Sequence, residues 1–190
     1  MDAIVEAALK KWPNVPHCYG WLALDARGDW YMRDERTQAA GPFPRVKGSR
    51  IEHDKLRDFI ARNYAADATG CWFFQNGPQR VYVELEAAPF VWRLAADPAS
   101  ATGPRITSHN GVDASFRSAH VDESGRLFAA TDIGFGIVHT LDIEAAADAV
   151  ERGEWLPEPV AFASLADRFG FRLSPAAARQ SPPSTPRQLP

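Results

Sequence analysis

Asp25-Ala-Arg-Gly28-Asp-Trp30-Tyr31 is the first of three copies of a pattern that joins Asp-x-x-Gly to a large hydrophobic pair. The other copies are Asp67-Ala-Thr-Gly70-Cys-Trp72-Phe73 and Asp122-Glu-Ser-Gly125-Arg-Leu127-Phe128. The Asp side chain accepts backbone hydrogen bonds in such a turn, and Gly supplies the left-handed residue that reverses the chain. Asp-x-x-Gly is also common turn chemistry, so one copy alone carries little weight. Together the three copies predict repeated hairpins and are compatible with a duplicated fold.

The composition is that of a globular protein that folds without metal or disulfide. The chain has 190 residues, 45% of them hydrophobic, which suits one large domain or two small ones. Its net charge of -3 disfavours non-specific binding to nucleic acid, which needs a basic face. We expect Cys18 and Cys71 to be free thiols, and residues 1–12 lack the apolar run of a signal peptide or membrane span. These features predict a cytoplasmic protein with no cofactor and no membrane contact.

Hydrophobic periodicity predicts an α+β fold. A small αββα unit is followed by an antiparallel β-meander or half-barrel with a closing C-terminal helix. The expected helices span residues 2–11, 54–64, 143–152 and 162–169. The expected strands span residues 18–24, 29–33, 71–75, 80–85, 90–94, 105–108, 114–121, 126–131 and 136–141. Because strands do not alternate with helices, a parallel nucleotide-binding sheet is disfavoured.

The order of these elements predicts a division into subdomains. We expect an N-terminal αββα subdomain at 1–66, a β-rich subdomain at 67–156, a packing helix at 157–173 and a disordered tail at 174–190. Antiparallel strands closed by one helix are the layout of a pleckstrin-homology-like half-barrel, and a closed barrel with a ligand mouth fits the same order. The tail is rich in Ser, Pro, Arg and Gln, and such segments bury too little apolar surface to become ordered.

Three stretches of the chain follow a pattern shared with known proteins: Gly28-Asp-Trp30, the helix from Leu56 to Tyr64, and the run from Gly70 to Ala88-Pro89-Phe90-Val91. In these stretches the chain resembles a proteobacterial family of domains of unknown function, the family numbered 1285 or a sister family. The resemblance covers residues 12–95, whereas Thr131 to Gly136 and the final helix depart from the family pattern. The resemblance implies a duplicated core, a pleckstrin-homology-like C-terminal half and a role in signalling or ligand binding. It carries over no catalytic residue.

The residues themselves provide no strong catalytic or metal signature. His17 and Cys18 are adjacent, so in an extended strand they point to opposite faces and the His is badly placed to activate the thiol. The five His are scattered without metal-ligand spacing. The Gly134/Gly136 pair is followed by an expected strand, which favours a bulge or turn over a phosphate loop. Glu84 and Glu86 share one strand face. The solvent-exposed face of a half-buried strand explains them as well as a pair of carboxylates for acid–base chemistry does.

Aromatic side chains near arginines are the best candidates for binding. Such pairs stack on flat or anionic ligands or anchor a protein partner, but they also form the core of small β-domains. Sites tend to lie where regular patterns break and between domains. We therefore expect a ligand-binding site at the junction of the halves. Its candidate residues are Trp30, Tyr31, Arg33, Asp132, Phe135 and His139.

The sequence thus favours a non-catalytic module that binds a small molecule or a protein in signalling or regulation. A small hydrolase or isomerase, with a site assembled from scattered Asp, Glu and His, is the alternative. RNA or single-stranded DNA binding through exposed aromatics is a third hypothesis, which the acidic charge disfavours. A homodimer is compatible with all three.

Overall fold

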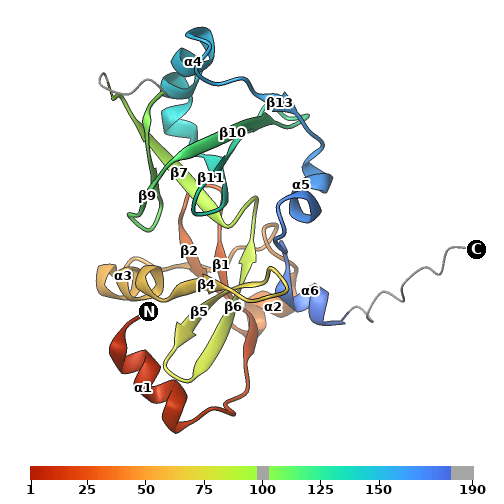
Figure 1. Cartoon of the computed structure of the whole chain (residues 1–190). Helices are drawn as coiled ribbons and strands as arrows, with labels where there is room; N and C mark the ends of the chain where they lie inside the picture. The colour runs from red at the N-terminus through yellow and green to blue at the C-terminus, as the bar shows by residue number, and fades with distance from the viewer. Residues whose placement is uncertain (98–102, 181–190) are drawn as a thin grey trace, which may run out of the picture.

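The computed structural model describes residues 1–97 and 103–180 as a mixed α+β protein built around two sheets (Figure 1). The first sheet contains β1 (Cys18–Leu24), β2 (Trp30–Met32), β3 (Ser49–Arg50), β4 (Tyr64–Ala66), β5 (Trp72–Asn76) and β6 (Gln79–Leu85). The second contains β7 (Phe90–Ala95), β8 (Arg105–Ser108), β9 (Asp113–Ala114), β10 (Phe116–Val121), β11 (Leu127–Thr131), β12 (Phe135–Val138) and β13 (Glu158–Pro159). In Figure 1 the second sheet lies above the first.

The two sheets repeat one strand order. The first runs β3-β2-β1-β6-β5-β4, and the second runs β9-β8-β7-β12-β11-β10 with β13 added beside β10. In each sheet the first and sixth strands of the unit pair in parallel, β1 with β6 and β7 with β12. The expected antiparallel meander is therefore wrong at the centre of each sheet. These central strands are mostly apolar, as is typical of parallel strands buried on both faces.

The three Asp-x-x-Gly copies form the same turn. In each, the carbonyl of Asp25, Asp67 or Asp122 accepts a bond from the amide of the Gly, at 3.1, 3.1 and 3.0 Å. The Asp Oδ1 atom also accepts bonds from the amides two and four residues on. The glycine φ angles are +83°, +81° and +75°. The local prediction is therefore confirmed, because each turn uses both the carboxylate and the glycine as expected.

Only two of the three turns are equivalent within the duplication. Asp67 begins the turn between the fourth and fifth strands of the first unit, and Asp122 begins the turn between the corresponding strands of the second. Asp25 instead begins the turn between the first and second strands. A further turn of this kind begins at Ser108, whose hydroxyl accepts a bond from the amide of Val112 at 3.0 Å. The Asp pattern missed it because Ser provides the acceptor.

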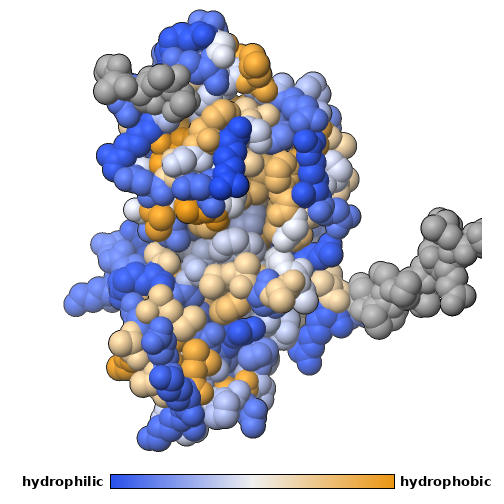
Figure 2. All heavy atoms as spheres, viewed as in Figure 1, coloured by the Kyte–Doolittle hydropathy of each residue, from blue (hydrophilic) through white to orange (hydrophobic). Residues whose placement is uncertain are grey.

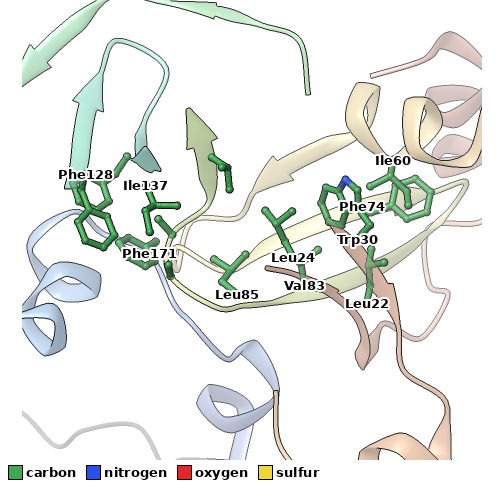
Figure 3. Close-up of a cluster of buried hydrophobic side chains, with 14 of the residues drawn as sticks. Leu22, Leu24, Trp30, Ile60, Phe74, Val83, Leu85, Phe128, Ile137 and Phe171 are labelled. Carbon is green, nitrogen blue, oxygen red and sulfur yellow. The ribbon is translucent and has the colours of Figure 1, made fainter. Parts of the chain in front are cut away.

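One hydrophobic core is shared by both sheets. Leu22, Leu24 and Val83 of the first sheet lie in the same buried cluster as Phe128 and Ile137 of the second (Figure 3). A second cluster around Trp92 fills the space between the second sheet and α4 (Ile143–Glu151). The halves therefore pack against each other through side chains.

The predicted boundary after residue 66 falls inside the first sheet. β4 pairs with β5 across it, and β6 returns to lie beside β1. The sheets instead change between Leu85, the last residue of β6, and Phe90, the first of β7. Sequence order misleads here because the β5–β6 hairpin completes a sheet that begins with β1.

The remaining helices lie around the sheets, in places the sequence predicted only in part. They are α1 (Ala3–Lys11), α2 (Glu35–Ala40), α3 (Asp54–Arg62), the 3-10 helix η1 (Thr140–Asp142), α5 (Phe162–Arg168) and α6 (Pro175–Gln180). The elements expected from the sequence include no helix where α2 forms. Leu165 of α5 is fully buried in the shared core. Over the described ranges, no helix has the length and apolar character needed to cross a membrane.

Helix α6 corrects the expectation of a disordered tail from residue 174. Its first amides are capped by oxygen atoms: Glu84 Oε1 accepts from Ala176 at 3.2 Å, and Ser174 Oγ accepts from Ala177 at 3.1 Å. Glu84 is thus buried beneath α6 rather than exposed, and burial raises its pKa. A distant carboxylate orders this segment, which composition could not reveal. The rest of the predicted tail, 181–190, lies outside the described residues.

Candidate functional site

The six predicted binding residues do not form one surface. Trp30 and Phe135 are buried at 3% and 4% exposure, as the alternative core interpretation predicts. Trp30 packs edge-on against Tyr64, whereas Phe135 stacks on Phe169 at the other end of the shared core. Their burial leaves little surface for a ligand because their rings complete the core.

The polar members of the predicted set are committed to internal contacts. The guanidinium of Arg33 donates to the carbonyls of Val46, Gly20 and Gly41, at 3.2, 3.4 and 2.6 Å. The Tyr31 hydroxyl donates to Asp25 at 3.2 Å.

Asp132 and His139 are also used within the fold. Asp132 Oδ1 accepts from the amide of Ser115 at 2.7 Å, and His139 Nδ1 accepts from the amide of Leu141 at 3.0 Å. Burial and the neighbouring Arg93 lower the pKa of His139. These four polar side chains hold turns and loops in place.

The junction of the halves nevertheless contains an open groove. It has a volume of about 370 Å³ and lies between the α3–β4 region, strand β5 and the turns of the second sheet. Its lining residues are Ala61, Arg62, Tyr64, Ala65, Trp72, Phe90, Asn110, Val112 and Ile133. Figure 2 shows hydrophobic atoms gathered along the lower margin of the upper half, where it meets the lower half. None of the six predicted binding residues is among these lining residues.

Three aromatic rings form the body of this groove. The centroid of Trp72 lies 4.7 Å from that of Tyr64 and 4.9 Å from that of Phe90. Tyr64 donates its hydroxyl to the carbonyl of Pro89 at 3.0 Å, and burial raises its pKa well above the ordinary value. Such a group stays protonated and holds its ring in place. The rings therefore form a preformed apolar surface.

His109 supports this aromatic cluster from the Ser108 turn. Its ring lies 5.6 Å from that of Trp30 and 5.9 Å from that of Tyr64, centroid to centroid. Nδ1 accepts from the amide of Val91 at 3.3 Å, and the buried Nε2 atom has no hydrogen-bond partner among the described residues. Burial lowers the pKa of His109 to about 4, so the ring is neutral near pH 7. The groove is thus backed by an uncharged imidazole.

Arg62 and Asn110 provide the polar rim. Arg62 is paired with Asp2, Nε to Oδ1 at 3.3 Å, with about half of its side chain exposed. Such an exposed pair is worth little and can exchange for a ligand carboxylate or carbonyl. Val112 adds an exposed apolar side chain at 47%. The site can therefore bind a largely apolar group with one polar contact.

A cluster of ionisable groups around Lys47, away from the groove, is held by its own ion pairs. Lys47 Nζ lies 2.9 Å from Asp25 Oδ2 and 3.0 Å from Glu86 Oε2. Burial opposes the charge on Lys47, but these carboxylates outweigh it and raise its pKa, so the amine stays protonated. A protonated amine held by two carboxylates is a poor base or nucleophile. Within the described ranges, no three His, Cys, Asp or Glu side chains gather as metal ligands.

Sequence reasoning missed the groove for identifiable reasons. Tyr64 was expected on the apolar face of the α3 helix, but that helix ends at Arg62 and Tyr64 begins the three-residue strand β4. Trp72 and Phe90 lie in predicted strands, where core packing explained them. A tyrosine just past a helix end, followed by an Asp-x-x-Gly turn, is the signal that could have indicated a short edge strand.

Comparisons with known proteins agree with the resemblance seen in the sequence. The family model DUF2944, described as "Protein of unknown function (DUF2946)", matches residues 1–176. No curated protein shows significant sequence similarity to the chain.

Two solved structures are similar to it. A DUF1285 family protein from Silicibacter pomeroyi DSS-3 has 13% identity and a TM-score of 0.48, over 78% of this chain and 84% of that one. A DUF1285 family protein from Shewanella baltica OS155 has 12% identity and a TM-score of 0.47, over 72% of this chain and 97% of that one. Both are members of the family numbered 1285.

Proposed function

The chain belongs to the DUF2944 family of proteins of unknown function, and we propose that it is a non-catalytic binding module whose ligand occupies the groove between its two sheets. The observation that carries this proposal is the ring cluster of Tyr64, Trp72 and Phe90 at the junction of the halves. Ligand sites are typically preformed, mostly apolar and placed between structural units, with a few polar groups at the rim. Arg62 and Asn110 provide that rim.

The proposal extends to the architecture and role of the two halves. Residues 1–85 and 90–151 would be two subdomains that share one core, the second being a pleckstrin-homology-like unit with α4 as its closing helix. Supporting this, Ala146 and Ala149 of α4 are buried against the second sheet. A binding module of this kind would act in signalling or regulation by presenting the groove to its ligand.

The test is a screen of small aromatic fragments by ¹H–¹⁵N NMR. We expect the bound fragments to shift the amides of Tyr64, Trp72 and Asn110 together. Trp72→Ala and Val112→Arg should weaken the binding of those fragments about tenfold or more, because the first removes a stacking surface and the second places a bulky side chain in the groove. Trp12→Ala is the matched control, since Trp12 is 51% exposed and does not line the groove. Hits that shift other regions, or that bind both groove variants normally, would contradict the proposal.

A further inference from the structure

Strand β4 is an open edge of the first sheet. The Asp67 amide donates to the Cys71 carbonyl at 3.0 Å, and the Gln75 amide donates to the Asn63 carbonyl at 2.9 Å. In an antiparallel pair, the backbone amide and carbonyl groups of successive residues point alternately toward and away from the neighbouring strand. The backbone groups of Ala65 therefore also face β5, whereas those of Tyr64 and Ala66 point away from it. No group in 1–97 or 103–180 bonds to the amide or carbonyl of Ala66.

The equivalent edge of the second sheet is covered. Strand β10 occupies the place of β4 in the duplicated order, and β13 pairs with it in parallel, Val121 opposite Pro159. The Val160 amide donates to the Val121 carbonyl at 2.9 Å. In Figure 1, β13 lies beside β10 in the upper half. In the second sheet, the edge that corresponds to β4 is thus covered by a short parallel strand.

The two edges can be matched residue by residue. Asp67 and Asp122 begin equivalent turns, so the residues before them, Ala66 and Val121, occupy equivalent positions. Both point their backbone groups away from the neighbouring strand of their unit. The carbonyl of Val121 accepts a bond from β13, whereas no strand of the described part of the chain covers the exposed Ala66. An unpaired edge of this kind is a template for an added strand.

The open edge also runs along the groove. Tyr64 and Ala65 of β4 both line it, and Val112 and Ile133 close its far side. A strand added beside β4 would alternate its side chains between the groove and the opposite face. A volume of about 370 Å³ suits one large apolar side chain and its neighbours. A strand paired with β4 would also place side chains in the groove, so both features favour an extended peptide as the ligand.

We propose that β4 binds an extended peptide segment of a partner protein as a parallel seventh strand, with one apolar side chain of that peptide in the groove. This rests on the proposed function and names the ligand class. The amide of Ala66 would donate to the peptide, and its carbonyl would accept from it, as Val121 does toward β13. The chain's own β13 is engaged at β10, and no other strand within 1–97 or 103–180 lies beside the outer edge of β4, so we assign this place to a segment of another protein.

The experiment selects binders from a phage-displayed library of random heptapeptides and titrates the synthetic peptides into the full chain. Ala66→Pro removes the outward amide, and proline is tolerated on an edge strand whose amide faces solvent. We expect Ala66→Pro to lower the affinity for the peptides about tenfold. The matched control Ala66→Val keeps the amide, and its affinity should stay within about threefold of wild type. Hydrogen exchange at the Ala66 amide should slow when peptide is bound.

A second arm removes the need for the protein variant. Peptides N-methylated at each position in turn should lose affinity at the amide that meets the Ala66 carbonyl and keep it at alternate positions. Selected peptides that tolerate both Ala66→Pro and every N-methylation would overturn the inference. So would a library that yields no binder while aromatic fragments still bind the groove in a Trp72-dependent way, a result that leaves the proposed function standing. Self-association abolished by Ala66→Pro would identify a second copy as the occupant and would also overturn it.

Discussion

The first and second sheets share a strand order but differ in what surrounds it. The second unit carries a short turn at Ser108 and has its outer edge covered by β13. The first unit has instead the long segment 33–48 between its second and third strands, and over 1–97 and 103–180 no strand pairs with the outer edge of β4. The shared topology therefore sets the strand order of both sheets, whereas the inserted and added segments decide which strand edges are exposed. The groove that we propose as a binding site lies where strand β4 of one unit meets the turns of the other.

The largest expected difference between the halves is at their equivalent turn glycines. Both Gly70 and Gly125 have positive φ angles, at +81° and +75°. A Cβ at Gly70 would meet the carbonyl oxygen of Gly170, whereas one at Gly125 would meet nothing within 4 Å. We expect Gly70→Val to cost about 3 kcal/mol or more and Gly125→Val about 1 kcal/mol, measured by urea unfolding. Equal losses would mean that the C-terminal segment does not pack on the first unit's turn.

The long segment of the first unit should depend on Arg33. Its side chain satisfies three carbonyls and is 4% exposed. Arg33→Met keeps an apolar stem but leaves those carbonyls without a donor, so we expect a loss of about 3 kcal/mol in unfolding free energy. Arg36→Met, on the exposed surface of α2, is the control and should change it by less than about 0.5 kcal/mol. An unaffected Arg33 variant would return this residue to the list of binding candidates.

The contact between the halves should weaken in mild acid through His109. Its pKa of about 4 lies below the ordinary value of 6.5, so between these values the unfolded chain binds a proton that the folded chain does not. Stability should therefore fall as pH drops from about 6.5 to 4, by about 2.5 kcal/mol from this residue.

The measurement compares urea unfolding at pH 7 and pH 4.5. His109→Asn retains an oxygen acceptor for the Val91 amide and should flatten the pH dependence, whereas His17→Asn, at an exposed position, should not. His120 and His139 also have pKa values lowered by burial, so a residual slope of the same sign should remain. An unchanged slope in the His109 variant would show that its imidazole is accessible to protons in the folded protein.

The smallest expected difference concerns the two edges. Val121→Pro removes the amide that faces β13 and should cost about 1–2 kcal/mol, whereas Ala66→Pro removes an unpaired amide and should cost less than about 0.5 kcal/mol. Thermal unfolding of the two variants checks this. A strongly destabilised Ala66→Pro protein would show that the first edge is already paired.

The sequence predicted those parts of the fold that depend on contacts between residues close together in the chain. The Asp-x-x-Gly turns and most strands were predicted because their hydrogen bonds join near neighbours. β4 and β13 were missed, since strands of three and two residues show no periodicity. The prediction of a disordered tail was wrong for residues 175–180, because the hydrogen-bond acceptor that orders α6 is Glu84, which lies far away in the sequence.

The sequence by itself determined the turns and the α+β class, and a site at the junction of the two halves stays a prediction. Only the tertiary structure decided which aromatic rings face that junction, because Trp30 and Trp72 have similar local patterns and differ in what the other sheet places over them. It also decided that β1 and β6 pair in parallel and that β4 stays open. Strand pairing joins residues that are distant in sequence, so neither periodicity nor composition records it.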